Sequence, residues 1–183
     1  MSTGPKFPLA DARRMAETLC ADLAPHCTRI EIAGSIRRAR PLVGDIEIVC
    51  IPKEVRVETG ADIFGEPIPG AEKQRDPGFV SVVKKYTATH VKGQAATGRY
   101  VQIITRTGVK VDLFMATPDN WGYILAIRTG SAEFSQSLAW RWKKLGFEGV
   151  GGMLTKFGKS ISFREERDLF DLLGIQWVQP SER

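Results

Sequence analysis

One segment constrains the fold of this 183-residue chain more than any other. Residues 44–51 read GDIEIVCI, in which Asp45 and Glu47 alternate with apolar residues until Pro52 ends the pattern. Because side chains alternate across a β-strand, this segment predicts a strand with both acids on one face. Ile46 and Ile48 then occupy the other face, which is hydrophobic.

A second segment has the same design. Residues 109–115 (VKVDLFM) place Asp112 between apolar residues and follow a predicted strand over 99–105, so an antiparallel hairpin is the natural pairing. If this strand neighbours the first one, three acids gather on one surface, and either their pKa values rise or a cation neutralises them. Carboxylate oxygens suit magnesium or manganese, and two such ions about 4 Å apart support in-line displacement at phosphorus.

A turn upstream of the acids has the features of a phosphate site. Gly34 and Ser35 open a basic stretch, IRRAR, where a helix N-terminus offers free N–H groups and an arginine can bind two phosphate oxygens. Taken alone, each feature more often belongs to a solvent-exposed surface without a binding role, as most Asp-x-Glu pairs and basic runs do. A phosphate-binding turn followed along the chain by strands with metal-binding acids favours an enzyme that uses nucleotides.

The rest of the chain alternates helical and extended patterns. Apolar residues at three- and four-residue steps predict helices over 8–23 and 134–145, the latter starting at Ser131. Shorter helices are expected over 79–86, 121–127 and 168–173, a small β region over 149–163, and a long loop or hairpin insert over 53–78, whereas 91–98 is ambiguous. A composition shift at 117–120 (TPDN) is the best candidate for a boundary between two lobes.

Composition excludes several classes of protein. With 43% hydrophobic and 26% charged residues, the chain is neither disordered nor collagen-like, and no apolar run approaches the ~20 residues of a membrane span. The N-terminus has no apolar signal region, so we expect no export. Three cysteines without CxxC spacing and only two histidines argue against disulfides and zinc, which indicates a reducing, cytoplasmic setting. The net charge of +5 is compatible with a polyanionic partner.

The segment AGSIRRARPLVGDIEIV (33–49) resembles the nucleotidyltransferase signature, most of all that of the DNA polymerase beta-like (family X) enzymes. Four later segments are similar to family motifs in the same order: HVKGQAATGRYVQIIT, VKVDLFM, RTGSAEF and ERDLFDLLGIQWVQPSER. The resemblance implies an α+β fold. A nucleotidyltransferase palm with a mixed or antiparallel sheet and helices on one side would span 1–117, and a small α/β thumb-like lobe would span 118–183.

The resemblance also implies roles for single residues. Asp45, Glu47 and Asp112 would be the catalytic and metal-binding acids for two Mg²⁺ or Mn²⁺ ions, with Asp112 also the general base toward a 3′-hydroxyl. The nucleoside triphosphate would be held by Gly34, Ser35, Arg38, Gly44 and Gly130. The expected reaction is transfer from a dNTP to the 3′-hydroxyl of a DNA primer end, by a reduced, repair-type polymerase that is monomeric and binds no membrane.

Several positions depart from the family pattern. The second acid is Glu47 rather than the usual Asp, and Ile127 and Arg128 replace an aromatic pair, which leaves discrimination between deoxy- and ribonucleotides open. Ser135 and Ala139 stand where an asparagine and an arginine often read the nascent base pair, so template use is also open. Fewer than thirty residues precede the Gly-Ser strand, which suggests a minimal enzyme without the family's DNA-gripping domains.

Duplex contact would then come from basic residues: Arg141, Lys143 and Lys144 on a thumb helix, with Lys84, Lys85 and Lys92. Trp140 and Trp142 could stack on bases, although packing is the commoner use of such residues. Two further hypotheses remain. One is a template-independent nucleotidyltransferase acting on RNA, a small molecule or a protein, and the other is a non-catalytic nucleic-acid-binding module.

Overall fold

A computed structural model of the protein describes residues 5–57 and 72–183. Its N-terminal part contains β1 (Phe7–Pro8), α1 (Leu9–Leu23), β2 (Cys27–Ile32), α2 (Gly34–Arg37), β3 (Leu42–Val43), β4 (Ile46–Pro52), β5 (Glu54–Val57), β6 (Glu72–Arg75), α3 (Pro77–Tyr86), β7 (Thr89–Gly93), β8 (Tyr100–Ile104) and β9 (Lys110–Met115). Its C-terminal part contains α4 (Trp121–Thr129), α5 (Ala132–Lys144), β10 (Glu148–Val150), β11 (Met153–Lys156), β12 (Lys159–Ile161) and α6 (Glu166–Leu172).

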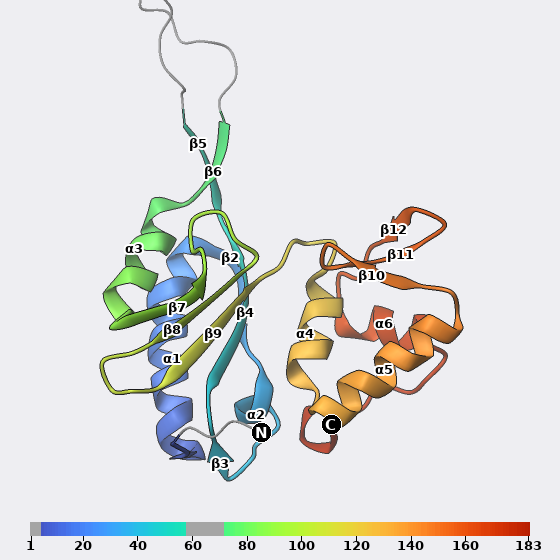
Figure 1. Ribbon diagram of the computed structural model, residues 1–183, viewed down its shortest axis with the longest axis horizontal. Helices are drawn as coiled ribbons and strands as arrows, with labels where there is room; N and C mark the ends of the chain where they lie inside the picture. The colour runs from blue at the N-terminus through green and yellow to red at the C-terminus, as the bar shows by residue number, and fades with distance from the viewer. Residues whose placement is uncertain (1–4, 58–71) are drawn as a thin grey trace, which may run out of the picture.

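The central sheet has the strand order β2-β4-β9-β8-β7 (Figure 1). β4 and β9 are parallel and the other neighbours are antiparallel, so the sheet is mixed. The predicted hairpin of residues 99–115 is confirmed as β8 and β9. The two acid-bearing strands are neighbours although four described strands and α3 lie between them in the sequence. The expected α+β fold with a mixed sheet is therefore confirmed.

The two faces of this sheet have different environments, as the alternation of β4 predicts. Ile46, Ile48 and Leu113 are buried in one core cluster with residues of α1 and α3, which lie on the same side of the sheet in Figure 1. The opposite face is covered only in part, where Trp121 and Leu125 of α4 pack with Ala33, Val49 and Phe114. Helices on one side leave the other side open for polar groups.

The C-terminal part has its own core. α4, α5 and α6 pack against a small sheet of order β10-β11-β12, and their buried side chains include Leu138, Trp142 and Phe170. The two tryptophans of α5 therefore differ, because Trp142 is a core residue and Trp140 is 57% exposed. The small β region predicted over 149–163 is confirmed by the three short strands.

Some boundaries differ from the sequence-based expectation. β4 begins at Ile46, so Asp45 precedes the strand, and α6 begins at Glu166, two residues before the expected start. The insert expected over 53–78 is, where described, the hairpin of β5 and β6, and its middle lies outside the described residues. The ambiguous stretch 91–98 contains the end of β7.

Two further findings concern chemistry and membranes. The three cysteines are free thiols, and burial raises the pKa of the Cys20 thiol to about 12, so this thiol stays protonated and unreactive at neutral pH. Within residues 5–57 and 72–183, no helix has the length and apolar character needed to cross a membrane.

Candidate active site

The site begins with two acids side by side on the partly open face of the sheet. β4 and β9 run parallel in a register that pairs Glu47 with Asp112, so their side chains project from adjacent positions. Asp45 lies two residues before Glu47, at the entrance to β4. Glu47 is half-buried and Asp112 is buried, and both are therefore partly removed from water. The neighbouring strands required by the sequence argument are present.

Three neighbouring side chains hold two of these carboxylates. Tyr100 donates a hydrogen bond to Oδ1 of Asp112 at 2.5 Å, and Gln102 Nε2 donates to the same oxygen at 2.6 Å. Lys110 Nζ lies 2.7 Å from Oδ2 of Asp45. Sequence reasoning missed all three, yet a signal existed: Tyr100 and Gln102 on β8, and Lys110 on β9, share a face with Asp112 by the period of two.

The crowding of acids changes the titration of Glu47. Burial, and then the negative charges of Asp45 and Asp112, raise the pKa of Glu47 to about 7, against the opposing effect of Arg128 and Arg38. Burial and the hydrogen bond to Asp112 also raise the pKa of Tyr100. A carboxylate with so high a pKa gains from a nearby cation, which is the electrostatic condition of a metal site.

The donor set fits hard divalent cations by its chemistry, because three carboxylates offer oxygen ligands only. The part of the chain that the structure describes holds no group of three or more His, Cys, Asp or Glu side chains close enough together to hold a metal ion. In the described structure Asp45 pairs with Lys110, and Asp112 accepts hydrogen bonds from Tyr100 and Gln102. The acids are neighbours, but they do not form a ready cluster.

The Gly34–Ser35 turn lies directly against Glu47. Gly34 has φ +60°, and a Cβ there would lie 1.9 Å from Oε2 of Glu47, so only glycine fits both the backbone and the space. Ser35 Oγ and Arg38 Nε are buried and have no hydrogen-bond partner among the described residues. Buried polar atoms without partners are costly, and these two atoms are available as hydrogen-bond donors to another group.

Arg38 and Gly130 meet across the two parts of the chain. Arg38 Nη1 donates to the backbone oxygens of Thr129 and Gly130, at 2.5 and 3.0 Å. A Cβ on Gly130 would lie 2.6 Å from Oγ of Ser135, so the turn packs tightly. Burial lowers the pKa of Arg38. Arg38 thus holds the turn between α4 and α5 against α2, while its buried Nε has no hydrogen-bond partner among the described residues.

A stack of aromatic rings and cations crosses the same face. The rings of Tyr100 and Phe114 stack with centroids 5.0 Å apart, and the Arg128 guanidinium lies 4.0 Å from the Phe114 centroid. Lys92 Nζ lies 5.3 Å from the Tyr100 centroid on β8. Arg128 also brings a positive charge toward Glu47, whose pKa it lowers.

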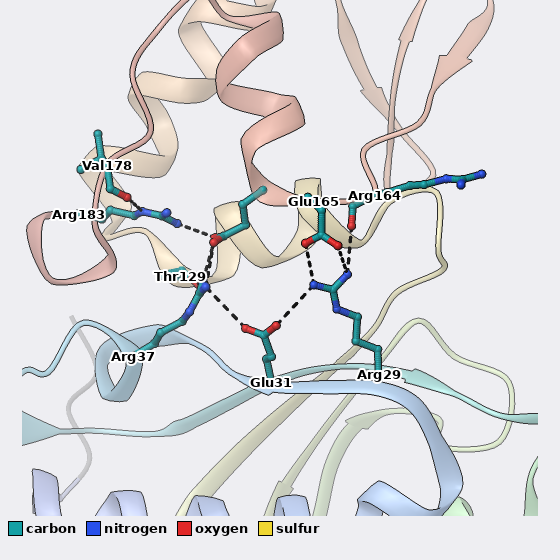
Figure 2. Close-up of polar contacts among 9 residues, drawn as sticks. Arg29, Glu31, Arg37, Thr129, Arg164, Glu165, Val178 and Arg183 are labelled. Atoms are coloured by element: carbon teal, nitrogen blue, oxygen red, sulfur yellow. Dashed lines mark hydrogen bonds and ion pairs between the residues drawn. The ribbon is translucent and has the colours of Figure 1, made fainter.

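A second group of charges joins the two parts of the chain beside the site (Figure 2). Arg37 donates two hydrogen bonds of 2.8 Å to the buried Glu166 and one of 2.7 Å to Thr129 Oγ1. Arg183 donates to the same Glu166 at 2.6 Å. These bonds outweigh burial and hold the pKa of Glu166 below its ordinary value. The sequence predicted a basic run here but not its partners.

A third arginine adds an exposed pair on the neighbouring strand. Arg29 of β2 donates two hydrogen bonds of 2.7 Å to Glu165 and lies 3.7 Å from Glu31, which in turn lies 3.6 Å from Arg37 (Figure 2). The charged groups thus alternate in sign along the junction. Arg37, Arg38 and Arg29 of the first part all bind residues of the second part.

Other expected residues are used differently. The Ser135 hydroxyl donates to the backbone oxygen of Ile127 at 2.9 Å, so it serves local structure. Gly44 lies in the bend before Asp45 and is half-buried. Lys85 pairs with Asp22 at 2.8 Å on the helix-covered side of the sheet, away from the carboxylates. Lys85 therefore takes no part in the arrangement around the acids.

Comparison with known proteins agrees with this geometry. Residues 124–183 match the family model described as DNA polymerase beta thumb. The fold is similar to that of Leishmania infantum polymerase beta in a ternary P/T complex, with a TM-score of 0.70, 17% identity and coverage of 98% of this chain and 77% of that chain. A ternary gap complex of the same polymerase gives a TM-score of 0.70, 16% identity and coverage of 98% and 71%.

A search of curated proteins finds no sequence match. The thumb match and the structural likeness nevertheless agree with the motif resemblance seen in the sequence. Residues 124–183 thus match the DNA polymerase beta thumb family, and the chain as a whole has a fold similar to that of DNA polymerase beta.

Proposed function

We propose that the protein is a metal-dependent nucleotidyltransferase that adds a dNTP to the 3′-hydroxyl of a DNA primer end. The observation that carries this proposal is the parallel pairing of Glu47 with Asp112, directly beside the Gly34–Ser35 turn. The fold supports it, because both similar structures are ternary complexes of a DNA polymerase. The net charge of +5 is consistent with DNA as a partner.

Asp45, Glu47 and Asp112 would hold the divalent cations, which are Mg²⁺ or Mn²⁺ by the all-oxygen donor set. When bound, such cations supply charge neutralisation at the transferred phosphoryl group. The carboxylates would have to leave their present partners, since Lys110 now holds Asp45. A bound cation would relieve the repulsion that the charges of Asp45 and Asp112 exert on Glu47.

The residues of the chain perform the remaining tasks. Ser35 Oγ and Arg38 Nε would donate to the triphosphate, since both are buried without partners among the described residues. Gly34, Gly44 and Gly130 would let the backbone approach the nucleotide. Two donors on Oδ1 fix the orientation of the Asp112 carboxylate, and Oδ2 would then accept the proton of the attacking 3′-hydroxyl.

The test is a primer-extension assay with the Asp112→Asn variant. We expect turnover to fall by at least ~10²-fold, in the range for a lost acid–base group, while nucleotide binding survives better. Asp171→Asn is a matched control, because Asp171 is an exposed residue of α6 far along the chain from the acids. Near-normal turnover in Asp112→Asn would remove Asp112 from the site.

Template-independent transfer is a second candidate, supported by one local contact. The Ser135 hydroxyl donates its hydrogen bond to the backbone oxygen of Ile127, and the Ala139 side chain has no polar group. Neither position therefore offers a donor to a template base pair. Extension of a gapped or primed template by the complementary nucleotide alone would support the polymerase. Homopolymer tailing, or tight nucleotide binding without extension, would support the alternative.

A further inference from the structure

The hairpin of β11 and β12 ends in an exposed aromatic residue. Lys156 and Lys159 form the last strand pair, which leaves Phe157 and Gly158 as the two turn residues. Phe157 is 93% exposed, the largest exposed fraction among the exposed large hydrophobic residues of the described chain. In Figure 1 this hairpin extends from the C-terminal part, on the side away from the central sheet.

The conformation of this turn disfavours phenylalanine. Phe157 has φ +51° and Gly158 has φ +73°, and positive φ at both positions is the requirement of a type I′ turn. Asn-Gly is the favoured pair in such turns, whereas an aromatic residue in the left-handed region crowds its own backbone. Phe157 buries almost nothing that could offset this cost. Hairpin stability therefore does not explain the residue, and an outlier of this kind points to a function.

Basic side chains lie on both sides of Phe157. Lys156 Nζ lies 5.6 Å from the Phe157 ring centroid, and Lys159 stands opposite Lys156 on β12. Residues 149–164 contain two lysines and an arginine but no acid. A nucleic-acid strand offers stacking bases and phosphates together, which suits an exposed ring between two lysines.

The hairpin is also joined to a basic helix end. Lys156 Nζ donates to the backbone oxygen of Leu145 at 2.8 Å, directly after α5 ends with Lys143 and Lys144. On α5, Lys144 Nζ lies 3.7 Å from the ring centroid of the exposed Trp140. An exposed aromatic residue with a lysine ammonium group near its ring thus occurs twice on this part of the molecule.

We propose that Phe157 is a stacking contact for an unpaired base of single-stranded nucleic acid, with Lys156 and Lys159 binding the adjacent phosphates. Every base has an aromatic face, so the contact would be independent of sequence, and the lysines would make it sensitive to salt. This contact does not depend on the carboxylate site, because it needs neither a metal nor a nucleotide.

The test measures binding of the full chain to a fluorescein-labelled oligothymidylate in EDTA, by fluorescence anisotropy. Phe157→Ala should weaken binding at least about fivefold, the low end of what one base–aromatic stack contributes. Phe157→Trp should keep the affinity, since the larger ring also stacks. Lys159→Gln should weaken binding and reduce its salt dependence.

Phe157→Asn separates a binding role from a structural one. It creates the favoured turn pair with Gly158, so the midpoint of thermal unfolding should rise by about 2 °C while oligothymidylate binding falls as it does in Phe157→Ala. A residue kept for structure would show a lower midpoint and unchanged binding. Wild-type binding in both variants overturns the proposal and favours a protein partner for the tip.

The same assay is independent of the proposed enzyme activity. Asp112→Asn should bind oligothymidylate like the wild type, since the hairpin is unchanged. If the wild-type protein binds oligothymidylate but transfers no nucleotide, only the proposed enzyme activity is contradicted. If the Phe157 variants bind oligothymidylate as well as the wild type does, only the hairpin contact is contradicted.

Discussion

At the scale of single residues, burial and neighbouring negative charges together raise the pKa of Glu47. It stands on β4 beside Asp112, two residues after Asp45, and Gly34 leaves room for its carboxylate on the other side. The Asp-x-Glu spacing in the sequence predicted the shared face. The tight contact with Gly34 and the donors on Asp112 could not be predicted, because they come from α2 and β8 and depend on tertiary packing.

The raised pKa of Glu47 predicts an unusual pH dependence of stability. The folded pKa of about 7 exceeds the ordinary value of 4.5, so between these values the folded protein binds more protons than the unfolded chain. The free energy of unfolding in EDTA should therefore fall as pH rises through this window, by about 3 kcal/mol at most. Glu47→Gln should remove this fall.

Urea unfolding of both proteins between pH 4 and pH 8 measures the effect, with Glu148→Gln on the exposed β10 as the control. Parallel pH curves for wild type and Glu47→Gln would contradict the burial of a charged Glu47.

At the scale of elements, local patterns predicted most helices and strands because each carries its own periodicity. α1, β4, β8 and β9 follow from apolar residues repeating at helical or alternating spacing. The stretch 91–98 was ambiguous because it contains two glycines, and the end of β7 that lies in it is exposed. The sequence of neither strand indicates the parallel pairing of β4 with β9, because this pairing depends on contacts between distant segments.

The N-terminus of α5 offers a prediction at this scale. Ser131 was expected to start the helix, and its Oγ accepts a hydrogen bond from the Phe134 backbone N–H at 3.2 Å. Ser131→Ala should lower the free energy of unfolding by about 1 kcal/mol, as for other helix caps. Ser137→Ala is the control within the same helix, because its hydroxyl bonds only an exposed backbone oxygen. Equal stability of the two variants in urea unfolding would argue against a capping role.

At the scale of the whole molecule, buried and exposed ion pairs join the two parts of the chain. Arg37 and Arg183 both bind Glu166, whose side chain is only 8% exposed. Breaking one partner of a buried pair leaves a charge without full compensation. The turn that carries Gly130 is thereby held beside the carboxylates, since Arg37 also binds Thr129.

Arg37→Ala should lower the free energy of unfolding by about 2 kcal/mol, less than for an isolated buried pair because Arg183 still binds Glu166. Arg37→Lys should recover part of this loss, since it keeps the charge without the two-nitrogen contact. Arg14→Ala, which breaks the exposed pair with Asp11, should change stability by less than about 0.5 kcal/mol. The midpoint of urea unfolding compares the three variants, and a loss in Arg37→Ala no larger than in Arg14→Ala would contradict a stabilising role.

The resemblance of the motifs and of their order to those of family X enzymes predicted the DNA polymerase beta-like fold. Local patterns by themselves predicted the acid-bearing strands and the glycine turn, because spacing and alternation are properties of neighbouring residues. Tertiary structure alone decided that Lys110 holds Asp45, that Tyr100 and Gln102 orient Asp112, and that Arg38 binds the Thr129–Gly130 turn. These contacts join side chains from separate elements. Their geometry depends on strand order and on how the two parts pack, and periodicity within one segment carries no information about either.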